Sequence, residues 1–245
     1  MKQPKLTIIH EDEDIVVVNK PAMILTVPDR YAPGKFNLKD FLKERYGKIF
    51  VVHRLDKETS GALVFARHAD AHRRLSLDFE NRRVEKIYWA LVQGQMVEDS
   101  GTIDKPLARS TVKYNKMLIH PRGKASRTDF RVLERFRYFT LVQARIHTGR
   151  LHQIRVHLAS IGYPLAVDYL YGGRSEFKLS EIKRGKYKQG KEAQERPLMT
   201  RVSLHARSLG FTHPGTGQHL NFTAELPKDF RAVLHQLRKW NKPAH

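Results

Sequence analysis

The stretch His53-Arg54-Leu55-Asp56-Lys57-Glu58-Thr59-Ser60-Gly61 lies between two apolar runs, Ile49 to Val52 and Ala62 to Phe65. The β-branched and aromatic residues of both runs predict buried strands, so the nine residues form the loop that joins them. A rigid pair of strands would hold the Asp56 carboxylate on a connecting segment, where catalytic groups are often found. We therefore predict that Asp56 is a catalytic nucleophile. The same residues would also suit an ordinary Asx turn with ion pairs to basic neighbours.

The charge of the chain indicates the kind of partner. The sequence has 245 residues, with 45 Lys and Arg against 25 Asp and Glu, a formal net charge of +20 and a pI near 10.2. Such an excess of cations predicts a polyanionic partner, most plausibly nucleic acid, because phosphates release counterions on contact. The hydrophobic content of 40% is enough for a real core.

The chain has no cysteine, which excludes disulfides, Cys-ligated zinc, iron–sulfur clusters and thiol chemistry. Its first residues lack the apolar segment of a signal peptide, and no run approaches the roughly 18 apolar residues that a membrane span needs. We therefore expect a cytoplasmic protein with no membrane contact.

Local patterns predict a mixed set of strands and helices. Strands are expected at 6–10, 15–19, 84–92, 112–119, 128–133, 139–146, 202–211 and 220–224, and helices at 37–46, 69–82, 151–161 and 228–240. Short turns between consecutive strands favour antiparallel pairing, so we predict an α+β domain in which helices flank a large, mostly antiparallel or mixed sheet. We expect residues 1–245 to form this single domain and residues 172–197 to be a basic loop insertion, either RNA-contacting or simply solvated.

Three motifs occur in a family-specific order. The first is the His53 to Gly61 stretch, the second is Lys86-Ile87-Tyr88-Trp89-Ala90-Leu91-Val92-Gln93-Gly94, and the third is Gly149-Arg150-Leu151-His152-Gln153-Ile154-Arg155-Val156-His157. In this order they resemble the RluA-type family of RNA pseudouridine synthases, and weaker similarity, as in Val16 to Pro21, extends to both ends of the chain. The resemblance implies the same fold, an RNA substrate, ribosomal or transfer, and no cofactor. Many relatives carry an N-terminal S4-type domain, which we do not expect here because the family-like region begins almost at once.

The resemblance implies a site made of Asp56, Tyr88 and Arg155. Asp56 must stay ionised although it is partly cut off from water, so it needs a cation, and Arg155 is the candidate. A helix over 151–161 would place Arg155 at the edge of its buried stripe, where its guanidinium can reach inward and pair with this carboxylate; the periodicity suits a surface arginine equally well. Strand alternation puts Lys86, Tyr88 and Ala90 on one face. If the other face fills the core, the Tyr88 ring could stack on a flipped uracil, or it could pack on a second layer.

The other candidates surround these three residues. Asp56 and Arg54 share one side of an extended segment, and the family uses the corresponding arginine to fill the space that the extruded uridine leaves. The remaining substrate-binding candidates are His53 as inward support, Thr59 and Ser60 as braces through local backbone hydrogen bonds, Arg150, His152 as a support or phosphate contact, and Leu158 as a pocket wall or plain core residue.

Metal binding is not expected. His147, His152 and His157 recur every five residues, a spacing that does not align ligands on one helix face. Three residues depart from the family pattern: Leu151, Val167 before an aspartate, and Met23 at a usual glycine position. Two other functions stay open, a non-catalytic RNA-binding or ribosome-assembly protein on the same fold and a basic DNA-binding module, although no DNA-binding motif is evident. We expect a monomer, because no apolar seam is evident.

Overall fold

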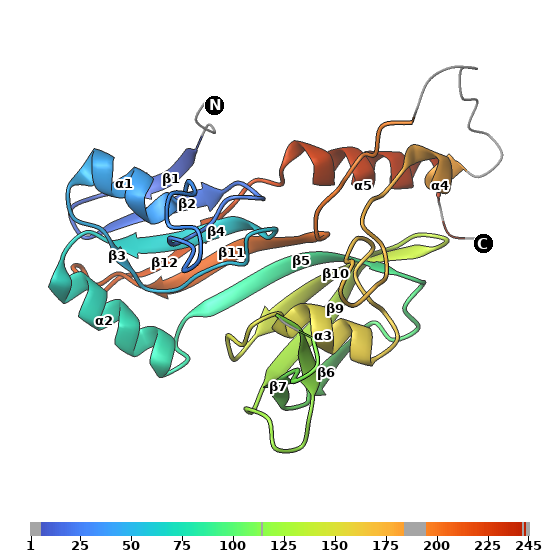
Figure 1. Cartoon of the computed structure of the whole chain (residues 1–245), viewed down its shortest axis with the longest axis horizontal. Helices are drawn as coiled ribbons and strands as arrows, with labels where there is room; N and C mark the ends of the chain where they lie inside the picture. The colour runs from blue at the N-terminus through green and yellow to red at the C-terminus, as the bar shows by residue number, and fades with distance from the viewer. Residues whose placement is uncertain (1–5, 114, 184–194, 242, 244–245) are drawn as a thin grey trace. The chain divides into compact units, whose positions relative to one another are not determined.

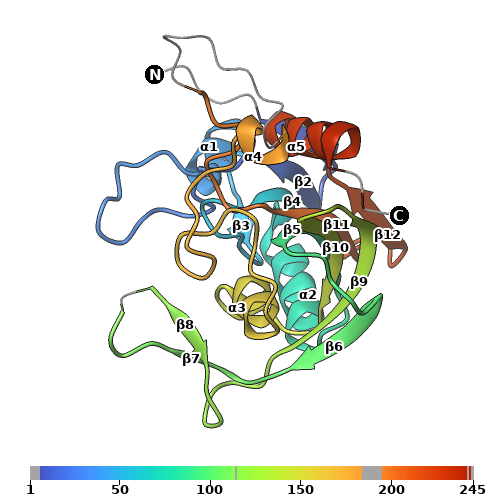
Figure 2. The same cartoon turned by 90° about the vertical axis from the view of Figure 1, so that its right-hand side faces the viewer.

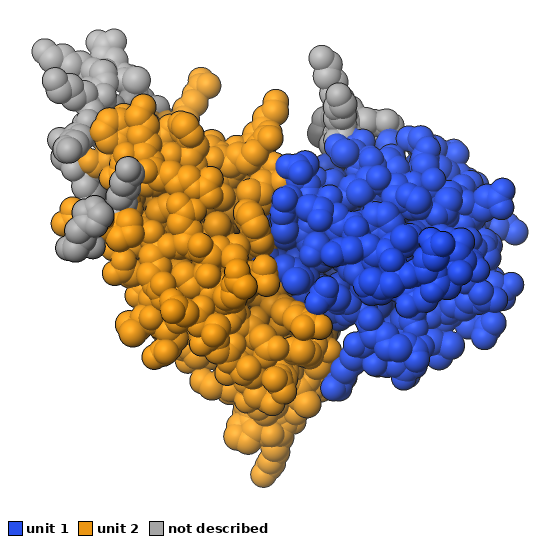
Figure 3. All heavy atoms as spheres, turned by 180° about the vertical axis from the view of Figure 1, so that it is seen from behind, with its two compact units in different colours: residues 1–88, 205–225 blue, residues 89–204, 226–245 orange. Residues whose placement is uncertain are grey.

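The computed structural model describes residues 6–113, 115–183, 195–241 and 243. The chain divides into two compact units, which Figure 3 colours separately. Unit 1 comprises residues 1–88 and 205–225, and unit 2 comprises residues 89–204 and 226–245. The described strands form a mixed sheet of ten strands and a separate two-stranded sheet (Figure 1). The predicted α+β class with a large mixed sheet and helices is confirmed.

Unit 1 is built on two strands that are buried along most of their length. Strand β2 (Ile15–Lys20) pairs antiparallel with β1 (Thr7–Glu11) and with β4 (Ser60–Ala66). Strand β4 also pairs in parallel with β11 (Leu204–Thr212), and the short strands β3 (Phe50–Val51) and β12 (His219–Thr223) add to β4 and β11. Because every residue of β4 is buried, its sequence is apolar without alternation.

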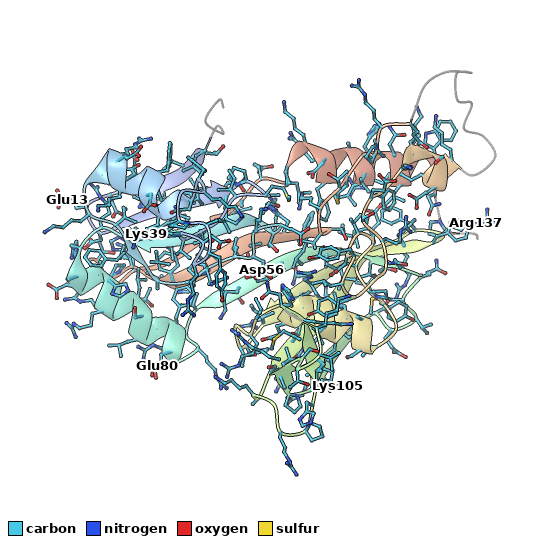
Figure 4. The ribbon with its side chains drawn as sticks, viewed as in Figure 1. Glu13, Lys39, Asp56, Glu80, Lys105 and Arg137 are labelled. Atoms are coloured by element: carbon cyan, nitrogen blue, oxygen red, sulfur yellow. The ribbon has the colours of Figure 1, made fainter. Side chains whose placement is uncertain are left out.

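Two helices complete unit 1. Helix α1 (Leu38–Tyr46) begins where the Asn37 side chain accepts a hydrogen bond from the Asp40 backbone N–H, and it ends at Gly47, whose φ is 77°. Helix α2 (Ala69–Glu80; Figure 4 labels Glu80) packs its apolar face, with Ala71 and Leu75, on the core formed by β2, β4 and β11. The loop between β3 and β4 is therefore mounted on a well-filled core.

Unit 2 contains the strand order β5-β10-β9-β6. These strands are β5 (Glu85–Gln93, which begins in unit 1), β10 (Phe139–Ile146), β9 (Arg127–Arg135) and β6 (Ser100–Asp104). The hairpin of β7 (Leu107–Arg109) and β8 (Met117–Ile119) forms the separate two-stranded sheet, visible in Figure 2.

Three helices belong to unit 2. They are α3 (Gln153–Ser160), α4 (Leu179–Lys183) and α5 (Lys228–Trp240). Helix α5 has the predicted bounds, and its buried residues Phe230, Val233, Leu234 and Leu237 follow helical spacing. No helix among the described residues is long and apolar enough to cross a membrane.

The local predictions were wrong in three places. The strand expected at 112–119 is confined to Met117–Ile119, and Val112 is 96% exposed because nothing covers it. Strands β6 and β7 were not predicted, since neither contains an alternating apolar run. The expected basic loop at 172–197 contains helix α4, whose Ile182 is buried, and residues 184–194 of that loop lie outside the described residues.

Candidate active site

The loop between β3 and β4 carries Asp56 and is held by hydrogen bonds on both sides of it (Figure 4). The Thr59 backbone N–H donates to the Asp56 carbonyl at 3.1 Å. The Thr26 hydroxyl accepts from the Leu55 N–H at 3.3 Å and donates to the Leu55 carbonyl at 3.1 Å. Leu55 is buried, Asp56 is half-buried and Arg54 is exposed, which confirms the predicted inward direction of Leu55. These hydrogen bonds fix the backbone on both sides of Asp56, so its carboxylate projects from a rigid segment.

His53 supports this loop from inside unit 1. Its Nε2 accepts a hydrogen bond from the Val64 backbone N–H at 3.2 Å, and its ring stacks on Phe79 with 4.5 Å between the ring centroids. Burial, followed by the positive charge of Lys86, lowers the pKa of His53 to about 3. The imidazole is therefore neutral at physiological pH and serves as an internal brace, as expected for an inward residue.

The predicted braces Thr59 and Ser60 do not act as expected. The Ser60 hydroxyl bonds Nδ1 of His205 at 2.9 Å, and Nε2 of His205 contacts the Ala224 carbonyl at 3.1 Å. Since a carbonyl only accepts, Nε2 carries the proton and Nδ1 accepts from Ser60. The parallel pairing of β4 with β11 sets Ser60 opposite His205, so a neighbouring strand, not the local backbone, supplies the partner. The buried Thr59 Oγ1 has no hydrogen-bond partner among the described residues.

Lys20 is a residue that the sequence did not single out. Its side chain is fully buried, and its Nζ donates to the carbonyls of Pro21 at 2.9 Å, Ile24 at 2.7 Å and Lys57 at 3.2 Å. Lys57 directly follows Asp56, so the ammonium connects the end of β2 to the β3–β4 loop. The available signal was a lysine at the end of an apolar strand, where a charge is rarely buried without such partners.

Tyr88 lies in unit 1 with Asp56 and responds to its charge. Tyr88 is 8% exposed, and its pKa is raised above the usual range, first by burial and second by the negative charge of Asp56. The strand face with Tyr88 and Ala90 is buried, whereas Ile87 and Trp89 are half-buried. Leu91 belongs to a hydrophobic core cluster on which Trp89 packs, as supposed for that face of the strand, and the Tyr88 face is buried as well.

Arg155 lies in unit 2 on helix α3 and is 1% exposed. Its Nε and Nη2 donate to Oδ2 and Oδ1 of Asp168 at 2.6 and 2.8 Å. The surface alternative for Arg155 is wrong, because the side chain is buried. The sequence proposed Arg155 as the cation for Asp56, whereas the planar fork of its guanidinium pairs here with another carboxylate. The carboxylate in this pair is Asp168, which the sequence did not propose as a site residue, although it noted the aspartate after Val167.

The other third-motif candidates, Arg150 and His152, lie just before α3, and the candidate Leu158 lies within the helix. The helix begins at Gln153, not at Leu151, because His152 adopts a left-handed conformation with φ of 54°. Nδ1 of His152 lies 3.0 Å from the Tyr171 hydroxyl, and Arg150 Nε donates to the Ala125 carbonyl at 3.4 Å. Leu158 is fully buried, which agrees with its reading as a core residue.

Buried polar side chains fix α3 to β9. Gln153 accepts from the Thr148 hydroxyl at 2.7 Å and donates to the Thr128 hydroxyl at 3.0 Å. Nε2 of His157 contacts the Lys105 carbonyl at 3.0 Å, so its Nδ1 accepts from Thr128 at 2.9 Å. These hydrogen bonds, absent from any local pattern, orient the helix that carries Arg155.

One cluster in unit 1 has the composition of a metal site. His10, Asp12 and His213 bring their ligand atoms within 4.8 Å of one another. Burial raises the pKa of Asp12, but hydrogen bonds from His10, the Ile15 and Asp14 backbones and His213 lower it to about 2. Nδ1 of His213 accepts from two backbone N–H groups, so Nε2 carries the proton and donates to Asp12. Oδ1 of Asp12 also accepts the backbone N–H groups of Asp14 and Ile15, so the cluster takes part in the hydrogen bonds of the β1–β2 turn.

Comparisons with known proteins agree on one family. Residues 14–160 match a family model described as RNA pseudouridylate synthase. The chain is 38% identical over 240 residues to the ribosomal large subunit pseudouridine synthase D of Pseudomonas aeruginosa, covering 96% of this chain and 72% of that protein. It is 36% identical over 243 residues to the protein of the same name from Haemophilus influenzae, covering 95% and 71%. The solved structure of human RNA pseudouridylate synthase domain containing 4 is similar with a TM-score of 0.72 and 26% identity, covering 95% of this chain and 93% of that one.

Proposed function

Because this chain belongs to the RNA pseudouridylate synthase family, whose members are cofactor-independent isomerases, we propose that Asp56 is its catalytic carboxylate and that a uridine in structured RNA is its substrate. The observation that carries this proposal is the setting of Asp56. The carboxylate sits half-buried on a hydrogen-bonded loop, and the pKa of Tyr88 is raised first by burial and second by the negative charge of Asp56. A carboxylate and a phenol that interact in this way suit acid–base chemistry at a nucleoside.

The reaction rearranges bonds within one nucleotide. Conversion of uridine to pseudouridine breaks the bond from N1 to C1′, turns the base in place and joins C5 to C1′. The proton leaves C5 and N1 gains one, so the product is an isomer and no oxidant or group donor is consumed. Amino acid side chains can supply every function that this sequence of steps needs.

Asp56 can serve this chemistry by more than one route. A carboxylate can attack an electrophilic carbon of the nucleotide, as glycosidase carboxylates do at an anomeric centre, or it can stabilise charge or remove a proton at the ribose. Each route needs an ionised carboxylate in a site partly closed to water. The three routes share the prediction that loss of the charge at residue 56 stops the reaction.

We also propose catalytic roles for Tyr88 and Arg155. The raised pKa of Tyr88 keeps its phenol protonated, so we assign it a neutral hydroxyl and a ring that can stack on uracil, not a phenolate base. Arg155 belongs to the third family motif, and a buried guanidinium is the group that keeps a carboxylate charged. We assign it the role of cation for the same reaction.

The proposed RNA contacts rest on exposure and charge. A uridine stacked in a helix is out of reach, so the enzyme must extrude it and replace the lost stacking. Arg54 is exposed two residues before Asp56 and has a flat guanidinium suited to that space. The names of two relatives point to large-subunit ribosomal RNA, and transfer RNA is the second candidate. We further propose that residues 1–245 act as one catalytic domain and as a monomer, in the cytoplasm where both RNAs occur.

The test is Asp56→Asn, which keeps the size of the side chain and removes its charge. We expect the rate of pseudouridine formation on ribosomal RNA fragments under single-turnover conditions to fall by at least about 10³-fold. RNA affinity and its dependence on salt should stay unchanged, because the charge that binds phosphate is untouched. Asp70→Asn, an exposed carboxylate of unit 1, is the matched control and should keep wild-type rates.

Two outcomes would contradict the proposal. Full activity of Asp56→Asn would remove the carboxylate from the mechanism. The second outcome is that the wild-type chain binds RNA with the same affinity as Asp56→Asn and forms no pseudouridine on ribosomal or transfer RNA. That result would favour the alternative, a non-catalytic RNA-binding or ribosome-assembly protein on this fold.

A further inference from the structure

We propose that Asp168 and Tyr171 are positioning residues for Arg155, and that Tyr171 couples this arginine to the β7–β8 hairpin. The inference rests on the proposed role of Arg155. All the residues involved lie in unit 2, on α3, on the segment after residue 167 and on the hairpin (Figure 2). Neither Asp168 nor Tyr171 was a candidate from the sequence.

Asp168 holds one edge of the guanidinium. The side chains of Arg155 and Asp168 are 2% and 0% exposed, and two hydrogen bonds of 2.6 and 2.8 Å join them. This bidentate pair uses Nε and Nη2, so it fixes both the position and the plane of the guanidinium. A buried ion pair contributes little net stability, which makes orientation the better account of its presence.

The same carboxylate also places Tyr171. Oδ1 of Asp168 accepts the backbone N–H groups of Leu170 at 3.0 Å and Tyr171 at 3.2 Å. The resulting turn brings the tyrosine ring under the arginine, with 5.2 Å between the Arg155 Cζ and the ring centroid. Arg155 is therefore held at its edge by a carboxylate and on its face by an aromatic ring, and a single aspartate sets both contacts.

The Tyr171 hydroxyl connects the Arg155–Asp168 pair to the β7–β8 hairpin. It accepts the Met117 backbone N–H of β8 at 2.8 Å and lies 3.0 Å from Nδ1 of His152, the left-handed residue that precedes α3. Leu107 and Met117 of the hairpin also pack with Val156 of α3 in a small apolar cluster. The Tyr171 hydroxyl is thus a polar link between the hairpin and the residues that position Arg155.

The hairpin is the more basic partner in this link. Residues 105–127 contain no acidic residue, one histidine, His120, and seven Lys or Arg, namely Lys105, Arg109, Lys113, Lys116, Arg122, Lys124 and Arg127.

Such a segment attracts RNA phosphates, so RNA bound to the hairpin would displace β8 and its residue Met117. Because the Met117 N–H bonds the Tyr171 hydroxyl, this displacement would move the Tyr171 ring that lies against Arg155. Placement of RNA on the hairpin and placement of the catalytic arginine are therefore coupled. A shift of about 1 Å in a catalytic group can cost about 100-fold in rate, so a small change in this link is measurable.

The test compares Tyr171→Phe with Tyr169→Phe. Tyr171→Phe keeps the ring beneath Arg155 and removes only the hydroxyl, and Tyr169, 57% exposed in the same segment, is the matched control. We expect the single-turnover rate constant of Tyr171→Phe to fall about tenfold or more, with RNA affinity nearly unchanged. A merely structural role would lower the fraction of active protein, which reduces the amplitude of the reaction and leaves its rate constant at the wild-type value.

Asp168→Asn provides a second variant, read together with Arg155→Lys. If Asp168 acts through the arginine, the two changes combined should slow the reaction no more than the larger single change. If Asp56→Asn is inactive, the proposed function stands. In that case a wild-type rate constant for Tyr171→Phe, or a loss of amplitude alone, would overturn the inference. An active Asp56→Asn would instead overturn the proposed function itself, so the two failures are distinguishable.

Discussion

His53 shows how a single side chain links the β3–β4 loop to the stability of unit 1. The folded protein keeps its imidazole neutral down to about pH 3, whereas an unperturbed histidine protonates near pH 6.5. Between these values the unfolded chain binds more protons than the folded one. The free energy of unfolding therefore decreases as the pH falls through this window, by at most about 1.4 kcal/mol per pH unit from this group.

We predict that His53→Gln, whose amide oxygen can still accept the Val64 N–H, weakens this pH dependence. Urea unfolding at pH 7 and pH 5 should show a loss for the wild-type protein that exceeds the loss for the variant by about 1–2 kcal/mol. The burial of His157 lowers its pKa as well, so the variant keeps part of the effect. Equal losses in the two proteins would show that His53 does not titrate as its surroundings require.

Alternation along the chain was sufficient to predict the inward direction of Leu55 and the exposure of Arg54. It could not reveal the Ser60–His205 bond or the three carbonyls around Lys20, because those partners come from other strands and loops. Met23 is an instructive case. Its φ is 66°, a left-handed conformation that glycine adopts without strain, which explains why the family pattern has glycine there.

The pairing of β4 with β11 depends on one glycine at the end of the β3–β4 loop. Gly61 has a φ of 123°, and a Cβ there would clash with the carbonyl oxygen of Ala206. We predict that Gly61→Ala destabilises the protein by about 3 kcal/mol or more, since the strands must separate or the backbone must change conformation. Urea unfolding measures the loss, and Gly34→Ala, where a Cβ meets nothing within 4 Å, should change stability by less than about 1 kcal/mol. Equal stabilities of the two variants would contradict the tight packing of this pair.

Helices and strands were predictable where one apolar face repeats over several turns or residues. Helix α5 and strand β10 have the bounds that the sequence predicts. The prediction of a strand at 112–119 was wrong at its start, because the Val112 side chain is exposed and packs in no core. Strand β6 has no apolar repeat, so it is a strand because it pairs with β9 and not because of its own sequence pattern. The pair of Arg155 with Asp168 spans 13 residues and two elements, which places it beyond any local pattern.

Taken as a whole, the chain combines a family-specific order of motifs with a large excess of positive charge. The order of three motifs was enough to predict the family, and the fold agrees with it. The charge of +20 accounts for RNA affinity in general, but it does not select one uridine, because site choice depends on the folded shape of the RNA.

The most direct measurement is a chemical map of pseudouridine in total RNA from cells that lack this gene and are supplied with the wild-type or the Asp56→Asn chain. We predict that pseudouridine disappears at one or a few defined uridines of ribosomal or transfer RNA, returns with the wild-type chain and stays absent with Asp56→Asn. Restoration of those sites by Asp56→Asn, or a map that does not change when the gene is lost, would contradict the assignment of Asp56 as the catalytic carboxylate.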